Sequence, residues 1–164
     1  MKRTRVCELF DITYPIVQGG MLWIATAELA AAVSNAGGLG VISPLAGMEK
    51  KGNPARNLKD QLTIIKQLTK KPFGINILLD LSYAETLVEI ALREKARIVI
   101  TSAGNPARFT ELFKKIGTKV LHVVSSVKQA LKAKSCGVDG VVAKGVEAAA
   151  HNGIDELPLF ALIP

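Results

Sequence analysis

The segment Gly145–Gly153 places a histidine in a loop of small residues, directly after the apolar stretch 140–144. Imidazole gains and loses a proton near neutral pH, so His151 is a candidate general acid or base. Glu147, four residues earlier, could orient the imidazole or simply cap the loop. A parallel strand that ended here would deliver His151 to the edge of the sheet where α/β folds bind ligands.

Glycines and an amide mark two other candidate strand ends. Gly19 and Gly20 close the apolar segment 16–20. Glycines there let a backbone come close to a flat or anionic ligand, although a tight turn would use them equally. Asn76 lies within the otherwise apolar segment 73–79. A buried amide needs hydrogen-bond partners, which either a ring system with alternating donors and acceptors or a neighbouring side chain would supply.

Two further sets of polar residues have simpler interpretations. Ser102 and Ala103 end another apolar segment, where small residues suit the wall of a ligand site and the start of a helix equally. His122 lies inside an apolar segment, which favours a hydrogen-bonded core residue over a catalyst. Cys7 and Cys136 are far apart without metal-ligand or redox spacing, so we expect inert thiols and no metal site.

The elements that must position these residues alternate between strand and helix. Six apolar segments are typical of parallel strands covered on both faces: 16–20, 39–43, 73–79, 97–103, 119–125 and 140–144. Helix starts are marked by capping side chains: Thr26, Asn53, Asn105, and Ser125 or Ser126. The apolar stripes expected to face the sheet include Phe109, Leu112, Phe113 and Ile116, and then Val127, Ala130 and Leu131.

This alternation predicts an α/β fold with an all-parallel sheet and helices outside it, in one domain. Two architectures use the pattern: an open doubly wound sheet and a closed eight-fold barrel. The 164 residues would complete an open sheet but supply only part of a barrel of ~250 residues. Length alone therefore favours the open sheet. No Gly-x-Gly-x-x-Gly motif follows the first strand, which counts against a dinucleotide fold.

Composition excludes several classes of protein. A hydrophobic content of 49% argues against disorder, and an aromatic content of 5% argues against a stacking surface for nucleic acid. The net charge of +7 comes mainly from lysines spread over the expected helices, which favours solvated outer faces over a nucleic-acid site. No apolar run is long enough to cross a membrane, and acidic residues interrupt the N-terminal region, so we expect a cytoplasmic protein.

Taken together, several segments resemble the nitronate monooxygenase family, formerly called 2-nitropropane dioxygenases, and its relatives the FMN-dependent enoyl-ACP reductases. The resemblance runs in register from about residue 10 to the C-terminus and rests on Tyr14–Met21, Ala36–Ile42, Lys71–Asn76, Val99–Pro106 and Gly137–Ala143. It implies a partial TIM (β/α)8 barrel with about six parallel strands and helices outside, in place of the open sheet.

The resemblance also implies roles for single residues. His151 matches the family's active-site histidine, proposed to bind the substrate or to remove a proton from the carbon next to the nitro group. The residues implied to contact FMN are Gly20, Met21, Leu22, Asn76, Ser102, Ala103, Glu147 and Ala150. In nitronate-oxidising members a nitronate reduces FMN, which then reacts with O2. In the enoyl reductases hydride passes from a nicotinamide cofactor through FMN to an enoyl thioester.

The chain departs from the family pattern near the histidine. The family usually reads Ala-Glu-Gly-x-Glu-Ala-Gly-Gly-His, whereas Lys144 replaces the first Glu and Ala149 and Ala150 replace the two glycines. An alanine at a position with positive φ would cost on the order of 1 kcal/mol. The cofactor phosphate of such barrels is held by loops after strands 7 and 8, and neither strand is expected within residues 1–164.

We therefore expect a single, incomplete FMN-binding barrel domain over residues 1–164, the N-terminal part of an oxidoreductase that oxidises nitronates with O2. As this fragment it should bind FMN weakly and turn over poorly. The alternatives are an enoyl-ACP reductase-like protein, a non-catalytic remnant or assembly module, and a flavodoxin-like binding domain with strand order 2-1-3-4-5. Exposed barrel edges would favour homo-oligomers.

Overall fold

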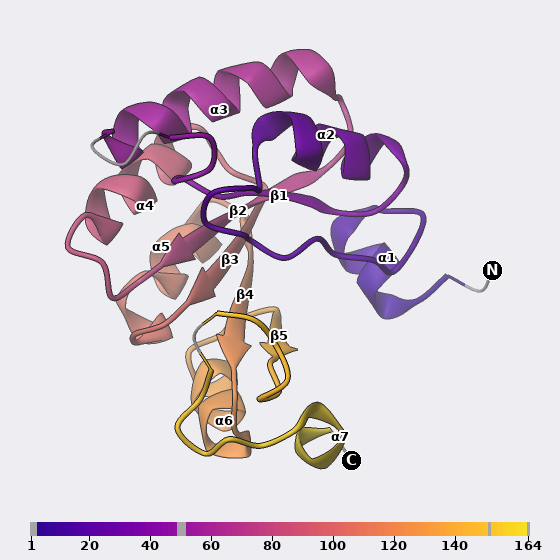
Figure 1. Cartoon of the computed structure of the whole chain (residues 1–164), viewed down its shortest axis with the longest axis vertical. Coiled ribbons are helices and arrows are strands. Elements are labelled where there is room, and N and C mark those ends of the chain that lie inside the picture. Colours follow the sequence, from indigo (N-terminus) through magenta and orange to yellow (C-terminus); the bar gives the residue numbers. More distant parts are fainter. Residues whose placement is uncertain (1–2, 49–51, 151, 164) are drawn as a thin grey trace.

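The computed structural model describes residues 3–48, 52–150 and 152–163, and from α2 onward each strand is followed by a helical segment (Figure 1). The helices are α1 (Arg5–Phe10), α2 (Ala27–Asn35), α3 (Pro54–Leu68), α4 (Ala84–Arg93), the 3-10 helix η1 (Pro106–Arg108), α5 (Thr110–Lys115), α6 (Val127–Ser135) and α7 (Leu159–Leu162). The strands are β1 (Gly40–Ile42), β2 (Phe73–Leu78), β3 (Ile98–Ser102), β4 (Lys119–Val124) and β5 (Gly140–Ala143).

The five strands form one parallel sheet in the order β1-β2-β3-β4-β5. Each strand therefore lies beside the one that precedes it in sequence, as in a barrel, and the order 2-1-3-4-5 of a flavodoxin-like sheet is absent. The flavodoxin-like alternative is thus wrong, and so is the preference for an open sheet that length alone suggested. The fold is that of the first part of a (β/α)8 barrel.

The segment 16–20, the first of the six predicted strands, does not form a strand in the structure. It is reduced to a parallel bridge between Val17 and Leu39, with Leu39 N–H donating to Ile16 O and Gln18 N–H donating to Leu39 O, both at 2.9 Å. The bridge has a neighbour on one side only, so pairing extends no further than this. It still places the segment beside β1, so the sequential order holds from the first segment to β5.

The side chains of the sheet divide into two cores. One lies between the sheet and its helices and contains Ile75, Ile77 and Val99 together with residues of α2 to α5. The other lies on the inner, concave face and contains Val41, Ile98, Ile100 and Leu121. Helix α1 covers the inner face from the N-terminal ends of the strands, and contributes Cys7 and Phe10 to that core. Cys7 is a buried free thiol, whereas Cys136 is a free thiol that is only half-buried.

Capping explains where most helices begin. The side chains of Thr26, Asn53, Asn105 and Ser126 accept hydrogen bonds from backbone N–H groups of the first turn of α2, α3, η1 and α6. The predicted helix over 105–116 divides at Phe109, where φ is −132° and ψ −13°, into η1 and α5.

The predicted burial of two apolar helical stripes is partly wrong. In α6, Val127 and Leu131 are 60% and 62% exposed, and Leu112 of α5 and neighbouring Ile116 are 44% and 46% exposed. Only Phe109 and Phe113 of the second stripe are buried. Helix α6 lies over β4 and β5 at the end of the sheet (Figure 1), where no further strand and helix of the described chain cover it.

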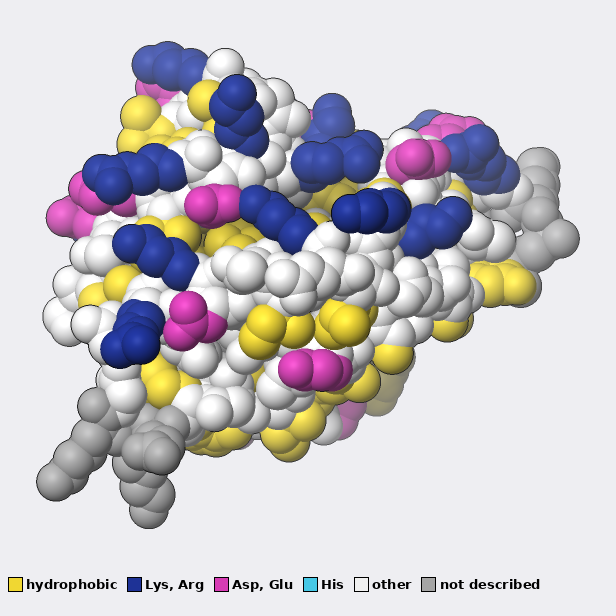
Figure 2. Space-filling model, turned by 90° about the horizontal axis from the view of Figure 1, so that it is seen from above, with side chains coloured by type: hydrophobic (Ala, Val, Ile, Leu, Met, Phe, Trp, Pro, Cys, Tyr) yellow, Lys and Arg dark blue, Asp and Glu magenta, His cyan; other side chains and the backbone are white. Residues whose placement is uncertain are grey.

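The surface carries charges of both signs. On the face that α3 covers, Lys and Arg side chains are interspersed with Asp and Glu, and hydrophobic side chains show between them (Figure 2). Several pairs are close, such as Lys66 Nζ to Glu94 Oε2 at 2.5 Å. Across the described residues, no helix combines the length and the apolar character needed to cross a membrane.

Candidate FMN site at the C-terminal ends of the strands

Inward-facing polar residues gather where the strands end. Because side chains alternate along a strand, Asn76 shares the inner face with Gly74, and Ser102 shares it with Ile98 and Ile100. Lys144 follows β5 on the same side as Val142, and its N–H continues the ladder by donating to Val124 O at 2.8 Å. These positions form the C-terminal rim of the sheet, the edge at which barrels build their sites.

Gly20 and Asn76 are brought into direct contact. A Cβ built on Gly20 would overlap Cβ and Cγ of Asn76, whereas one built on Gly19 would meet nothing within 4 Å. Gly20 is therefore required because Asn76 occupies the space of its missing side chain. The exposed backbone of residues 19 and 20 stands open beside the amide, as a flat ligand requires.

Asn76 keeps its hydrogen-bonding capacity unused. The residue is only 5% exposed, and its amide forms no hydrogen bond within the described part of the chain, although its polar atoms still reach the open rim. Nearby along the first segment, Gln18 Oε1 is buried without a partner, although Gln18 Nε2 donates to Val41 O at 3.0 Å. Buried polar groups without partners are costly, and a ligand with ring donors and acceptors would satisfy those at the rim.

These features fit the ring of FMN. The Asn76 amide has two donors and an acceptor to offer, Gly20 presents bare backbone, and the Ser102 hydroxyl adds a half-buried polar group on the next strand. Ala103 and Gly104, with φ of 52° and 72°, turn the chain sharply away after Ser102. The described rim thus fits the ring, whereas none of its elements corresponds to loops after a seventh or eighth strand.

Met21 and Leu22 begin the turn that leads into α2. Met21 is 39% exposed beside Gly20, and its carbonyl accepts from Ala25 N–H at 3.0 Å. The carbonyl of Leu22 accepts from the Ser43 hydroxyl at 3.0 Å, which ties this turn to the end of β1. The turn places the Met21 side chain at the surface and holds residues 20–22 at the rim.

The loop after β5 is organised by Glu147. Its carboxylate accepts from Leu159 N–H at 2.9 and 3.2 Å, and Val146 N–H donates to Leu157 O at 2.8 Å. The loop-capping role weighed for Glu147 is therefore what the structure shows for its carboxylate. His151, the predicted catalytic residue, lies outside the described residues, so the relation of Glu147 to that imidazole stays a prediction.

Ala150 occupies backbone that favours glycine. Its φ is +67°, which meets the condition under which an alanine in place of a family glycine was expected to be strained. We expect Ala150→Gly to raise the free energy of unfolding by about 0.5–1 kcal/mol, because it relieves Cβ strain but adds chain entropy. Urea denaturation measures it. The matched control is Ala149→Gly, whose φ is not positive; equal effects of both substitutions would contradict the strain argument.

His122 is a core residue, as its position indicates. Its Nδ1 lies 2.8 Å from Thr101 Oγ1, which also donates to Leu121 O at 3.1 Å. Both side chains are buried, and burial lowers the pKa of His122. A histidine kept neutral in the folded state and free to protonate in the unfolded chain makes stability fall as pH falls below the unfolded pKa of about 6.5.

We therefore expect the free energy of unfolding to decrease between pH 7.5 and pH 5.5, with a contribution from His122 of at most about 1.4 kcal/mol per pH unit. Urea midpoints measured at three pH values test this. His122→Gln, which keeps a polar side chain for Thr101, should give a flatter profile than the unchanged chain. Parallel profiles for the two proteins would show that His122 does not titrate on unfolding.

Lys144 puts a cation at the rim where the family pattern has a carboxylate. The side chain is half-buried, and burial lowers its pKa. The inward position of Lys144, like the orphaned acceptor of Gln18, could not be read from residue type. Gln18 belongs to the segment that carries the family resemblance, but only the packing of its neighbours reveals its buried oxygen.

The fold defines the N-terminal part of a TIM-type barrel, with a polar rim at the C-terminal ends of its strands. The chain matches the family model described as nitronate monooxygenase over residues 3–86 and 81–164. It belongs to the nitronate monooxygenase family. No cluster of metal-ligating side chains occurs within the residues that the structure covers.

Curated relatives span the same region. The chain is 33% identical over 151 residues to the (3aS,4S,5R,7aS)-5-hydroxy-7a-methyl-1-oxo-octahydro-1H-indene-4-carboxyl-CoA dehydrogenase of Rhodococcus jostii, with 92% of this chain and 41% of the relative covered. It is 30% identical over 191 residues to the nitronate monooxygenase of Pseudomonas aeruginosa, with 93% and 53% covered. The chain thus spans about half the length of the curated relatives it matches.

Two solved structures share the fold of this chain. FabK from Thermotoga maritima superposes with a TM-score of 0.89 at 40% identity, over 99% of this chain and 50% of that chain. The nitroalkane oxidase from Streptomyces ansochromogenes superposes with a TM-score of 0.79 at 20% identity, over 97% and 56%, which is a likeness of fold alone. The sheet described above therefore corresponds to a partial barrel.

Proposed function

We propose that this chain forms the N-terminal half of an FMN-dependent oxidoreductase that oxidises nitronates with O2, as one incomplete barrel domain. The observation that carries the proposal is Asn76, a nearly buried residue whose amide has no partner among the described residues at the C-terminal rim and packs against the bare backbone of Gly20. Membership of the nitronate monooxygenase family supports the reaction class.

Different residues would bind the cofactor and the substrate. FMN, when bound, supplies the acceptor for two electrons from the substrate. Asn76 would pair with the polar edge of the ring, Gly20 to Leu22 would line one side of it, and Ser102 and Ala103 would line another. His151 would hold the substrate or accept the proton from the carbon next to the nitro group. Glu147 and Ala150 belong to the loop that carries His151, and the carboxylate of Glu147 anchors that loop to α7.

The half-length of the chain limits what it does alone. In barrels of this class the phosphate of the cofactor is held after strands 7 and 8, and the described sheet ends at β5. We expect this polypeptide to bind FMN weakly and to turn over poorly. The exposed Ile16, Ile24 and Leu131, at 63%, 64% and 62%, leave apolar side chains at both ends of the sheet and favour self-association.

Enoyl or acyl thioesters are the second candidate substrates. The alignment with the Rhodococcus dehydrogenase needs 151 positions to cover 92% of this chain, whereas that with the Pseudomonas nitronate monooxygenase needs 191 positions to cover 93%. The second alignment therefore contains residues that this chain lacks. Because the name of the Rhodococcus relative contains a CoA thioester, this observation favours the thioester class.

The tests use the sole tryptophan, Trp23, which lies in the turn after Met21. FMN is titrated while Trp23 fluorescence is followed. Oxygen uptake with propionate-3-nitronate and NAD(P)H oxidation with an enoyl thioester are then compared in the chain and in His151→Ala. Weak quenching with little turnover is expected. Efficient nitronate oxidation that His151→Ala abolishes would refute the inactivity of the fragment, and no quenching at millimolar FMN would refute the site.

Location and partners follow from the same proposal. Two free thiols suit a reducing compartment, so we infer a cytoplasmic protein. Its partners would be a small-molecule substrate, O2 and copies of itself, without nucleic acid or membrane, since basic side chains are interspersed with acidic ones in Figure 2.

A further inference from the structure

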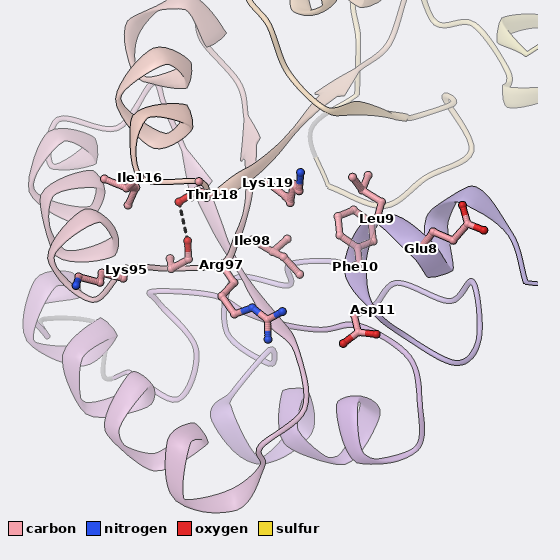
Figure 3. A pocket seen from close by; sticks show the side chains of 12 residues that line it. Glu8, Leu9, Phe10, Asp11, Lys95, Arg97, Ile98, Ile116, Thr118 and Lys119 are labelled. Carbon is pink, nitrogen blue, oxygen red and sulfur yellow. Dashed lines mark hydrogen bonds between the residues drawn. The ribbon is translucent and has the colours of Figure 1, made fainter.

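A cavity lies at the opposite end of the sheet from the FMN site, between α1 and the N-terminal ends of β3 and β4. It holds about 280 Å3, close to the lower end of the range for small-molecule sites. Its walls come from residues 8–11, 95–98 and 116–119 (Figure 3). The site described above uses none of these residues.

The floor of the cavity is apolar. Phe10 and Ile98 are each only 3% exposed and belong to the inner core, and Leu9 packs against that core. Ile116 stands at the wall and is 46% exposed. An apolar ligand body that covered part of this surface would remove it from water, which is favourable.

Two cations, Arg97 and Lys119, flank this floor, and the protein neutralises their charge only in part. Arg97 has no ion pair among the described residues. Lys119 Nζ lies 3.9 Å from Asp139 Oδ1, but that oxygen already accepts from Lys114 at 2.6 Å. Figure 3 shows the Arg97 and Lys119 side chains on two sides of Ile98.

The acidic residues of the cavity do not cancel this charge. Asp11 is paired with Arg3 at 3.5 Å, and the Glu8 side chain points away from Ile98 in Figure 3. A second hollow of about 210 Å3 adjoins the first through residues 95–97 and adds Lys70 and Lys71, together with Lys66, whose charge is paired with that of Glu94. The potential around Arg97 is therefore positive, which attracts anions.

We propose that this cavity binds a small amphiphilic anion, a ligand with a short apolar body and one carboxylate or phosphate group. The apolar body would lie against Leu9, Phe10 and Ile116, and the anionic group would pair with Arg97 and Lys119. The planar guanidinium of Arg97 can bind either group through two parallel hydrogen bonds. The hollow shape and the buried aromatic floor favour such a ligand over an extended polyanion.

The test is a titration of the 15N-labelled chain with hexyl phosphate, followed by the amide signals of Ala96, Arg97, Gly117 and Thr118. Saturable shifts of these signals are expected. Hexanol should bind at least about tenfold more weakly, since it lacks the charge-assisted hydrogen bonds. Inorganic phosphate should also bind more weakly, since it lacks the apolar body. The proposal would be overturned if hexanol or inorganic phosphate bound as tightly as hexyl phosphate. It would also be overturned if the shifts were confined to residues 16–24 or 127–141.

Substitutions on two walls of the cavity test whether the ligand binds there. Arg97→Gln and Ile116→Glu should each weaken hexyl phosphate about tenfold or more, through lost and opposed charge. The matched controls are Arg93→Gln, at the exposed end of α4, and Leu112→Glu, which has nearly the same exposure as Ile116 at 44% but lies outside the cavity. Equal losses in the controls and in the cavity variants would show non-specific attraction to a basic protein and would overturn the site.

Discussion

Gly40→Ala is expected to lower the free energy of unfolding by about 3 kcal/mol or more. Helix α2 crosses β1 so closely that a Cβ on Gly40 would overlap the backbone carbonyl of Ala30. Both residues are fully buried, and a helix backbone cannot move aside without opening the core between α2 and the sheet. Gly40 N–H also donates to the Ser34 hydroxyl at 3.1 Å, and a displaced helix would lose this hydrogen bond.

Urea denaturation of Gly40→Ala beside Gly74→Ala measures the effect. Gly74 lies on the neighbouring strand and is also buried, but a Cβ there would make ordinary contacts at 3.4–3.6 Å with Ile98 and Val41. We expect Gly74→Ala to change stability by less than about 1.5 kcal/mol. Similar losses for both variants would mean that any added methyl harms this sheet, and that the α2–β1 approach is not special.

The strands and helix starts could be predicted because their causes are local. The apolar segments 73–79, 97–103 and 119–125 became β2, β3 and β4, and single capping side chains such as Thr26 and Asn53 set the first residues of α2 and α3. Such signals act over one turn of helix or one strand, so they survive without knowledge of the neighbours.

The misplaced stripes have a different cause. Val127 and Leu131 have the spacing of a buried helical face, but a pattern does not say which element covers the face. In the structure α6 contacts only β4 and β5 to any extent, so half of its apolar stripe remains exposed. The segment 16–20 failed as a strand for a related reason, because it pairs only with Leu39 and has no partner on its other side.

The sequence predicted which residues belong to the candidate site better than it predicted which of them contact one another. Asn76 was found because an amide inside an apolar segment needs hydrogen-bond partners, Ser102 because it ends such a segment, and the resemblance to a family gave both a role. The packing of Gly20 on Asn76 and the bond from Leu159 N–H to Glu147 join residues far apart in sequence. Only the folded chain brings these pairs together, so no local rule predicts them.

The Gly20–Asn76 contact leads to the largest effect expected on ligand binding. Gly20→Ala would place a Cβ where Cβ and Cγ of Asn76 already lie, so either the turn or the amide must move. The Asn76 backbone is fixed within β2 by pairing with β3, and we therefore expect the turn of residues 19–22 to shift. Because misplaced donors lose the strength of their hydrogen bonds, FMN affinity should fall about tenfold or more.

Quenching of Trp23 by FMN reports this loss, and the same samples give the urea midpoint. Asn76→Ser, which keeps a small polar group but removes the amide, should weaken FMN to a similar extent while leaving the turn in place. Gly19→Ala is the control for the fold, since a Cβ there meets no atom of the protein and stability should stay within about 0.5 kcal/mol. If Gly20→Ala binds FMN as well as the unchanged chain, the amide of Asn76 does not contact the flavin. If Gly19→Ala alone weakens FMN without loss of stability, the ring lies over the open backbone of residue 19 and away from Asn76.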